Sequence, residues 1–268
     1  MALDRAWQLI KSATNITLLT HYKPDADGIS ACAAFDLILR KMGKNVQAVY
    51  PSKPESLINR QPKDVLIASH TITPDLIIAC DTANYERLYY PEAFLRIPLI
   101  NLDHHVSNSI MGTVNLINPD AASTCEELFY LFMIWCPEMI DKAVAECLLY
   151  GILYDSQVFH TQSTTARTLR TAAECIDHGV NMFALSKELL ANKNPTMIHL
   201  WGDILQSVTI DAKKEAAWAV VRQADLKRHG VQLDSIVGLN NFLAEIALID
   251  VTILFYEAED GSTKVSMR

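Results

Sequence analysis

An acid and two adjacent histidines, Asp103, His104 and His105, closely follow the apolar run 97–100. These side-chain types bind metal ions and move protons, and an ordinary surface loop has no reason to gather them after a buried strand. Because adjacent side chains on an extended segment point to opposite sides, we expect the two histidines to have different tasks, one facing a metal and the other a cleft. Simple exposure or core packing would also account for two histidines in a loop.

Further acids and histidines follow other expected elements. His21, Asp25 and Asp27 come after the first strand, Asp81 follows another strand, and Asp155 ends a helix. In an open parallel sheet the ligand crevice lies at the carboxyl ends of the strands, so these groups should meet at one edge. Each has a structural alternative, because the first could be an Asx turn or a helix N-cap, Asp81 could cap a loop and Asp155 could pair with a lysine. Their coincidence favours a single site.

The ligand set itself indicates the chemistry. Five carboxylates with two or three histidines are more than one cation needs, and oxygen-rich ligation suits Mn²⁺ or Mg²⁺ rather than structural zinc. Two divalent ions about 3.5–4 Å apart can lower the pKa of a water for attack on phosphorus. The chain has no G-x-S-x-G elbow, P-loop or G-x-G-x-x-G, so serine-hydrolase, NTPase and dinucleotide-oxidoreductase functions have little support.

Short apolar strands alternate with helices, which predicts an α/β fold with a mostly parallel sheet flanked by helices. We expect strands at 15–20, 46–50, 76–80 and 96–102, and helices at 4–13, 29–42, 123–135, 141–154 and 164–178. Residues 51–63 are proline-rich and polar and should form a loop. Ser123 and Glu126 have the spacing of a capping box, and we prefer this helix start to a ligand role.

The pattern lapses around residues 191–195, which predicts a second, smaller α+β domain. We therefore expect a catalytic domain at 1–188, a linker at 189–203 and a partial substrate-binding domain at 204–268. The expected elements of the last part are neighbouring strands at 207–211 and 217–222, a helix at 238–246 and a hairpin of 250–257 with 263–267.

Composition limits the class of protein. The 268 residues carry a formal net charge of −8 without a basic block, which argues against a grip on long nucleic acid. The six cysteines lack a C-x-x-C pair and lie in apolar contexts, as expected of reduced, buried thiols. The N-terminus has no apolar signal core, and the longest apolar run, 128–136, is too short to span a bilayer. We expect a cytoplasmic protein with no membrane partner.

Four motifs in register make the chain similar to the DHH phosphoesterases: 21–28, Asp81, 103–105 and 150–155. The resemblance runs from residue 1 to the C-terminus. Segments around Phe159, 164–165 and 172–179 resemble the branch that contains nanoRNase/pAp phosphatases. The final segment, 264–268, is similar to the start of the DHHA1 substrate-binding domain of that branch, which would then be incomplete here.

The resemblance implies a role for each matching residue. His21 and Asp25 would hold one metal ion, with Asp81 bridging to a second that Asp27, His104 and Asp155 complete. His105 would contact the scissile phosphate, Asp103 would orient the histidines, and Arg268 would contribute to substrate binding. His105, Asp103 and Asp81 are then the expected catalytic residues, with two Mn²⁺ ions, or Mg²⁺ in their place, as cofactors and a bridging hydroxide attacking in line.

The chain departs from the family pattern in two places. The family's fourth motif usually reads Asp-Thr-Gly, whereas this chain has Asp155-Ser156-Gln157, in which Ser156 keeps a hydroxyl and Gln157 is bulkier. The glycine-rich, histidine-containing segment that normally follows the last strand is missing. We expect either a truncated chain or a metal centre with a weaker grip on its substrate.

The expected function is hydrolysis of short oligoribonucleotides to mononucleotides and of 3′-phosphoadenosine 5′-phosphate to AMP. The expected partners are short RNA or small nucleotides, and a homodimer is left open. One alternative is a phosphodiesterase for linear or cyclic signalling dinucleotides. Another is a non-catalytic nucleotide-binding protein that lacks the recognition segment. Pyrophosphate or polyphosphate hydrolysis has less support, since residues 162–165 match that relative's pattern only in part.

Overall fold

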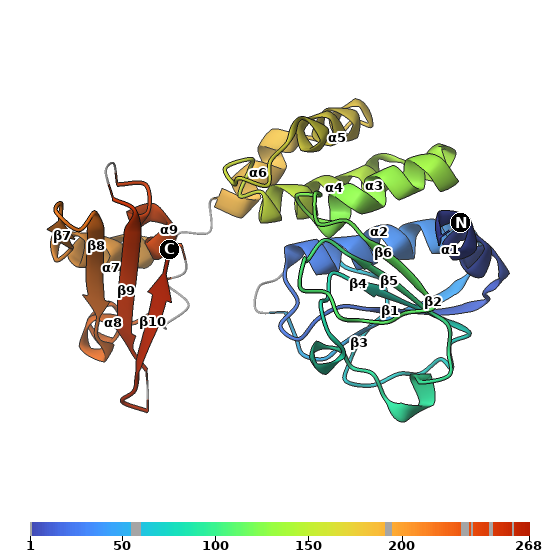
Figure 1. Ribbon diagram of the computed structural model, residues 1–268, viewed down its shortest axis with the longest axis horizontal. Helices are drawn as coiled ribbons and strands as arrows, with labels where there is room; N and C mark the ends of the chain where they lie inside the picture. Colours follow the sequence, from blue (N-terminus) through green and yellow to red (C-terminus); the bar gives the residue numbers. More distant parts are fainter. Residues whose placement is uncertain are drawn as a thin grey trace. The chain divides into compact units, whose positions relative to one another are not determined.

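The computed structural model describes residues 2–54, 60–190, 195–231, 236, 238–246, 249–258 and 260–268. The chain divides into two compact units, Met1–Leu189 and Leu190–Arg268. The first unit is α/β, with a six-stranded parallel sheet flanked by helices, and the second is a smaller unit with a mixed sheet (Figure 1). This architecture confirms the predicted fold class.

All pairings in the first sheet are parallel, and its strand order is β3-β2-β1-β4-β5-β6. The strands are β1 Asn15–Leu19, β2 Asn45–Tyr50, β3 Val65–Ile67, β4 Leu76–Cys80, β5 Leu99–Asp103 and β6 Val114–Ile117. The chain builds the sheet outward from β1 in one direction and then outward from β4 in the other. The order therefore reverses between β1 and β4, where open parallel sheets form their ligand crevice.

Each face of this sheet contributes to a different core. Alternate side chains such as Leu18 and Ile78 pack with the helices, while Leu19 and Ile77 point into a smaller core with Phe94 on the opposite face. The helices of this unit are α1 Ala2–Ser12, α2 Ala26–Lys41, α3 Thr124–Trp135, α4 Lys142–Asp155, α5 Ala166–Asp177 and α6 Met182–Leu190. Short 3₁₀ turns lie at η1 Tyr85–Arg87, η2 Glu92–Phe94 and η3 Pro137–Met139.

Several elements differ from the sequence prediction. Helix α2 begins at Ala26, three residues earlier than expected, because the side chain of Asp25 caps it. Strands β3 and β6 were not predicted, since they have only three and four residues and β6 alternates buried with exposed positions. Residues 55–59, part of the expected loop, lie outside the described residues.

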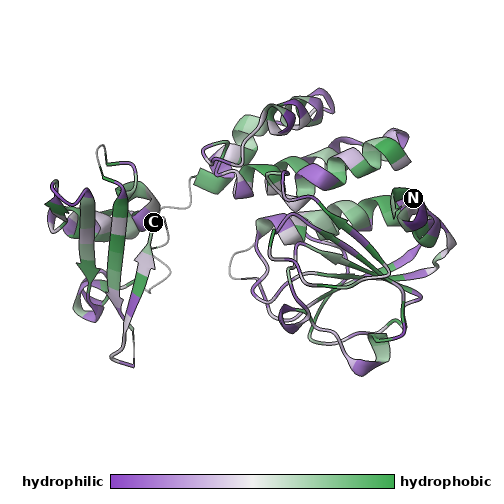
Figure 2. Ribbon diagram, in the orientation of Figure 1, coloured by the Kyte–Doolittle hydropathy of each residue, from purple (hydrophilic) through white to green (hydrophobic). Residues whose placement is uncertain are grey.

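The second unit has a four-stranded sheet of order β10-β9-β8-β7, in which only β8 and β9 are parallel. Its elements are α7 Pro195–Gln206, β7 Thr209–Asp211, β8 Ala216–Val221, α8 Gln223–His229, α9 Leu239–Leu243, β9 Val251–Glu257 and β10 Thr263–Met267. Strands β8 and β9 are mainly hydrophobic (Figure 2). The predicted β9–β10 hairpin is confirmed, with Gly261 at φ +77° in its turn.

Helix α7 occupies most of the range in which we expected a linker. Leu200, Trp201 and Ile204 are buried on one face of this helix and belong to the core of the second unit. Their spacing is that of an amphipathic helix, which the break at 191–195 hid from the sequence analysis. A linker over 195–203 is therefore wrong.

The six cysteines are free and buried, as predicted. Within the described ranges, no helix combines the length and apolar character that crossing a bilayer requires.

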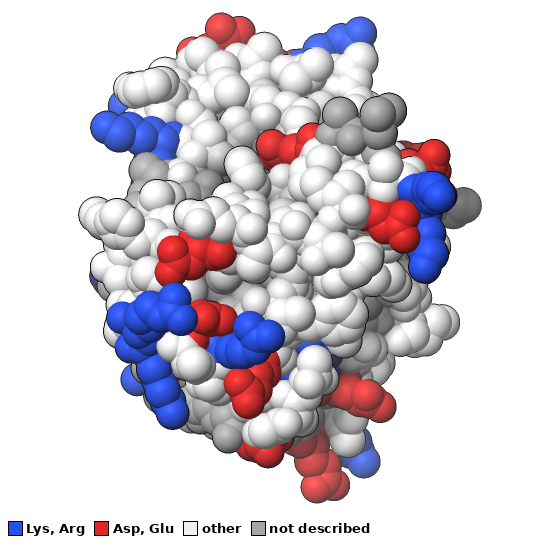
Figure 3. Space-filling model, turned by 90° about the vertical axis from the view of Figure 1, so that its left-hand side faces the viewer, with Lys and Arg blue, Asp and Glu red and all other residues white. Residues whose placement is uncertain are grey.

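Figure 3 shows one face of the molecule, on which Lys and Arg side chains are interspersed with Asp and Glu.

Candidate metal centre

The loop between β1 and α2 positions the first ligand candidates. Asp25 caps α2 through Oδ1, which accepts hydrogen bonds from the backbone N–H groups of Asp27 at 3.1 Å and Gly28 at 3.2 Å. Its other oxygen, Oδ2, lies 3.6 Å from Nε2 of His21. The N-cap and the ligand candidate are thus the same residue, because a carboxylate has one oxygen for each task.

A glycine is needed where α2 begins. A Cβ built on Gly28 would overlap Oγ1 of Thr20 and lie 3.2 Å from Oδ2 of Asp81. The Thr20 hydroxyl is fully buried and has no hydrogen-bond partner among the described residues. Gly28 therefore allows the first turn of α2 to approach the end of β4, with a polar atom already aimed into the space between them.

Asp81 lies at the centre of the cluster. It follows β4 with φ +55°, a left-handed conformation that aspartate and asparagine adopt more readily than most residues. Its Oδ2 lies 3.6 Å from Nε2 of His21, while its Oδ1 lies 3.7 Å from Nε2 of His104 and 3.6 Å from Nδ1 of His105. Asp81 is only 2% exposed, so its two oxygens face different histidines in a buried environment.

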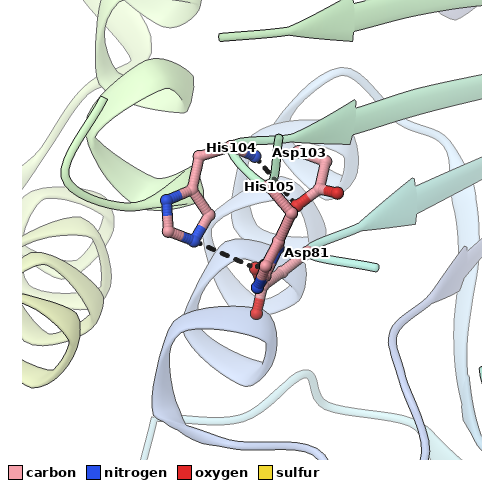
Figure 4. Close-up of side chains that lie close together, drawn as sticks. All are labelled: Asp81, Asp103, His104 and His105. Atoms are coloured by element: carbon pink, nitrogen blue, oxygen red, sulfur yellow. Dashed lines mark hydrogen bonds and ion pairs between the residues drawn. The ribbon is translucent and has the colours of Figure 1, made fainter. Parts of the chain in front are cut away.

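Both histidines after β5 turn toward Asp81, as Figure 4 shows. Their ring centroids are 4.6 Å apart. The expectation that they point to opposite sides is wrong, because β5 ends at Asp103 and the alternation of an extended strand stops there. They still differ in environment, since the side chain of His104 is 17% exposed and that of His105 is 41% exposed.

Asp103 is held by three donors. Its Oδ1 accepts from Nδ1 of His105 at 2.7 Å and from the backbone N–H of His104 at 2.8 Å, and its Oδ2 accepts from Nδ2 of Asn108 at 2.6 Å. Burial opposes the charge of Asp103, but these bonds, with that of His105 first, lower the pKa of this carboxyl. Asn108 was missed as a functional residue, and only its position five residues after Asp103 could have suggested it.

The start of α3 holds two of the other carboxylates. The backbone N–H groups of Thr124 and Cys125 donate to Asp27 at 2.7 and 3.0 Å, and Oγ1 of Thr124 donates to Oδ1 of Asp81 at 3.1 Å. Ser123 caps α3 as predicted, by accepting from the N–H of Glu126. The sequence favours a helix start over a ligand role for this segment, and the structure adds a third role, the support of two buried acids.

Helix α4 delivers Asp155, whose Oδ2 lies 3.2 Å from Nε2 of His104. The Nδ1 of the same ring lies 3.3 Å from the carbonyl oxygen of Ala121. An Nδ1–H donated to that carbonyl leaves Nε2 with a free lone pair, the arrangement in which histidines usually bind metals.

Three overlapping groups of donor atoms could each hold a metal ion, with all donors of a group within 4.8 Å of one another. They are His21 with Asp25 and Asp81; Asp27 with His104 and Asp155; and Asp81 with Asp103, His104 and His105. The structure thus brings together every predicted site residue of the first unit. Arg268 belongs to the second unit, where its backbone pairs with Thr252, so its role stays a prediction.

The charges of the cluster suit divalent cations. Within the described part of the chain, four of its five aspartates form ion pairs, all of them to histidines. Burial and then the charge of Asp155 raise the pKa of Asp27 to about 7, and burial and then the charge of Asp27 raise that of Asp81 to about 7. Buried carboxylates that raise each other's pKa in this way are stabilised as anions by a metal ion.

These pKa shifts predict how stability depends on pH. Asp27 and Asp81 have ordinary pKa values of 3.8 when the chain unfolds. Between about pH 4 and 7 the folded protein therefore binds more protons than the unfolded chain, and its stability falls as the pH rises. Burial would lower the pKa of His104, but Asp155, Asp27 and Asp81 raise it to about 10. The protonated ring therefore contributes fully to stability below about pH 6.5, and this contribution is lost as the pH rises from there toward 10.

We expect metal-free protein to melt at least about 2–4 °C lower at pH 8 than at pH 5.5, the equivalent of about 1 kcal/mol for a domain of this size. Excess Mn²⁺ should raise the melting temperature more at pH 8, since metal binding competes with these protons. Thermal unfolding followed by circular dichroism, with and without chelator, measures both effects. A metal-free protein that is more stable at pH 8 would contradict the assigned shifts.

Gln157, where the chain differs from the family's fourth motif, lies in a strained turn. Gln157, Val158 and Phe159 have φ values of +49°, +58° and +68°, so three successive residues after α4 are left-handed. The hydroxyl of Ser156 secures this turn by accepting from the N–H of Phe159 at 3.0 Å and donating to the carbonyl of Ile152 at 2.6 Å. This left-handed glutamine stands where the family resemblance leads us to expect a glycine, which adopts such angles without strain.

We expect Gln157→Gly to stabilise the protein by about 0.5–1 kcal/mol. Removing the Cβ relieves about 1–2 kcal/mol of left-handed strain, and the added freedom of the unfolded chain offsets part of that gain. Gln157→Ala keeps the Cβ and serves as the control, with no gain expected. Urea unfolding of the three proteins measures the difference, and equal stability of the glycine and alanine variants would refute the strain.

Comparisons with known proteins give the family. The Bacillus subtilis (strain 168) protein "Bifunctional oligoribonuclease and PAP phosphatase NrnA" is 27% identical over 263 residues, which cover 94% of this chain and 80% of the relative. The Thermus thermophilus protein of the same name is 28% identical over 200 residues, 72% of this chain and 59% of that relative.

Solved structures agree with the fold. A crystal structure described as an exopolyphosphatase-related protein from Bacteroides fragilis has a TM-score of 0.90 at 18% identity, covering all of this chain and 82% of the other.

The family model "DHH family, N-terminal domain" matches residues 15–152, just over half of the chain, and includes β1 to β6, α2, α3 and most of α4. The chain belongs to the DHH family.

Proposed function

We propose that this DHH-family chain is a phosphoesterase that uses two divalent metal ions. Its substrates are short oligoribonucleotides, hydrolysed to mononucleotides, and 3′-phosphoadenosine 5′-phosphate, hydrolysed to AMP. The observation that carries the proposal is a set of three donor groups at the carboxyl edge of one sheet, in which the central group shares Asp81 with one neighbour and His104 with the other. The names of the Bacillus and Thermus relatives support the choice of substrates.

The distances support the proposed ligand roles. In the proposal, His21, Asp25 and Asp81 hold one ion, and Asp27, His104 and Asp155 hold the other. Asp81 is proposed to reach this second ion as well, since its Oδ1 lies 3.7 Å from Nε2 of His104. Mn²⁺ is the expected ion, with Mg²⁺ as its substitute, and an exonuclease RecJ of similar fold, with a TM-score of 0.51 at 14% identity, was solved bound to manganese. Such ions would activate a water and stabilise charge on the phosphoryl oxygens.

The remaining residues of the cluster act on the substrate and on the histidines. Asp103, fully buried and fixed by Asn108, orients His105 through the 2.7 Å hydrogen bond to Nδ1. The same bond raises the pKa of His105 and so favours the protonated ring, in which Nε2 also carries a hydrogen and can donate to a phosphate oxygen. Arg268, in the second unit, is proposed to contact the substrate. The proposed boundary between the two domains lies near residue 189. We propose that the enzyme acts in the cytoplasm.

Replacing each histidine by alanine tests the division of roles. His104→Ala should reduce the Mn²⁺ bound at saturation, because the ring belongs to two of the donor groups. His105→Ala should keep the bound Mn²⁺ and lower turnover by about 10²–10³-fold, the usual cost of losing one fixed donor to a developing charge. Metal analysis and steady-state kinetics give both quantities, and loss of metal only in His105→Ala would reverse the assignment.

The function itself is tested with three substrates at equal concentration: a diribonucleotide, 3′-phosphoadenosine 5′-phosphate and a cyclic dinucleotide. We expect hydrolysis of the first two with Mn²⁺ and none after chelation. Preference for the cyclic dinucleotide would favour the signalling phosphodiesterase. Fewer than about one equivalent of bound Mn²⁺ and no hydrolysis would favour a non-catalytic nucleotide-binding protein.

A further inference from the structure

Arg87 has a backbone fixed against the loop that carries His21. It ends η1, and its N–H donates to Oδ1 of Asn84 at 3.2 Å, the N-cap of that turn. Its carbonyl oxygen accepts from the N–H of Tyr22 at 2.6 Å. The segment after β4 and the segment after β1 are therefore joined at this arginine, beside the metal-ligand candidates Asp81 and His21.

The side chain of Arg87 lies at the rim of the cluster. Its Nη2 is 2.8 Å from Nδ1 of His21 and 3.5 Å from the carbonyl oxygen of Tyr22, and the residue is exposed. Within the described residues it forms no ion pair, whereas Arg40, Arg60 and Arg167 each lie within 4 Å of carboxylates. Among the described residues, Arg87 thus holds a positive charge with no carboxylate within 4 Å of it.

Arg87 and His105 meet the cluster at different oxygens of Asp81, Arg87 by way of His21. The His21 ring that Arg87 contacts faces Oδ2 of Asp81, and His105 faces Oδ1, each at 3.6 Å. A phosphate group above Asp81 would therefore have a donor on either side. The guanidinium presents parallel N–H groups that match two phosphate oxygens, which a single histidine cannot do.

We propose that Arg87 binds non-bridging oxygens of the substrate's scissile phosphate, opposite His105. This inference rests on the proposed function, because it concerns the phosphate that the same site would hydrolyse. An anionic substrate that approaches five aspartates needs positive charge beyond the metal ions, and Arg87 supplies it at an exposed position. The fixed backbone limits the reorganisation needed to reach the phosphate.

The test compares Arg87→Ala and Arg87→Lys with Arg96→Ala, an exposed arginine whose removal should leave activity unchanged. Binding of inorganic phosphate to the Mn²⁺-loaded proteins is measured by calorimetry, together with kcat/KM for the diribonucleotide. We expect Arg87→Ala to weaken phosphate binding about tenfold or more, Arg87→Lys to recover part of it, and bound Mn²⁺ to stay the same.

Two results would overturn the proposal. Unchanged phosphate binding in Arg87→Ala would show that the guanidinium does not touch the anion. Loss of bound Mn²⁺, with unchanged phosphate affinity in the protein that remains loaded, would show that Arg87 acts only through His21. If the wild-type protein hydrolyses none of the substrates, the proposed function is wrong. Calorimetry would still show, independently of activity, whether Arg87 binds phosphate.

Discussion

Asp81→Asn should lose at least about 10²–10³-fold in kcat/KM for the diribonucleotide, together with part of its bound Mn²⁺. Asp81 belongs to two of the three donor groups, and each of its oxygens faces a different set of histidines. Asparagine keeps the shape of the side chain and adopts the left-handed backbone conformation as readily, so the variant should fold. What it removes is the negative charge.

The same substitution should stabilise the metal-free protein. Burial and the charges of Asp27 and Asp25 raise the pKa of Asp81 to about 7, so ionising it above that pH costs folding free energy that asparagine does not incur. We expect a higher melting temperature for Asp81→Asn than for wild type at pH 8 in chelator, and a smaller difference at pH 5.5. Thermal unfolding at the two pH values measures it.

Asp36→Asn is the matched control. Asp36 is also a buried aspartate of the first unit, but its carboxylate lies 2.8 Å from Nε of Arg40 and accepts from the N–H of Lys63. Its substitution should destabilise the protein by about 1–3 kcal/mol and leave Mn²⁺ binding intact. An Asp81→Asn variant that is destabilised like the control, or that keeps wild-type activity, would contradict the two-ion site.

Gly151→Ala should reduce both stability and metal binding. A Cβ on Gly151 would overlap Sγ of Cys125 and lie 2.6 Å from Oδ1 of Asp27, closer than real Cβ contacts allow. Helix α4 and the start of α3 would have to separate, or Asp27 would have to move. We expect a loss of about 1–3 kcal/mol in stability, the usual cost of overpacking, with weaker Mn²⁺ binding measured by titration.

Gly202→Ala provides the opposite case. Gly202 lies in helix α7, and a Cβ there meets nothing within 4 Å. Alanine is the better helix former, so this variant should gain up to about 1 kcal/mol and bind Mn²⁺ like wild type.

The double variant Gly151→Ala with Cys125→Ala should recover part of the lost stability, because one of the two overlaps disappears. If Gly151→Ala binds Mn²⁺ normally, α4 does not control the position of Asp27.

The fold was largely predictable because its strongest signals are local. The continuous apolar strand 76–80 and the Gly261 turn each fix their own structure, and both were found. Strands β3 and β6 were missed because they are defined by pairing with β2 and β5, which the sequence does not display. Helix α7 was missed because the sequence pattern breaks at 191–195, just before the buried face of this helix begins.

The acids and histidines of the site were found by type and by resemblance, whereas their supports were not. Thr124 and Asn108 carry no chemical signature, and their contacts to Asp81 and Asp103 depend on where α3 and the loop after β5 lie. Gly151 lies within the fourth motif, but only the space around it shows why a side chain does not fit there. The strain at Gln157 likewise appears only in the backbone angles.

The bonds from α3 to Asp27 also bear on how the molecule forms. Thr124 and Cys125 stand 97 and 98 residues beyond the acid that they support. Contacts of such long sequence separation close late, after the entropy of a long loop has been lost. During synthesis, residues 15–81 would emerge with three of the aspartates but without these donors. Tight metal binding should therefore be the last property the first unit acquires as it folds.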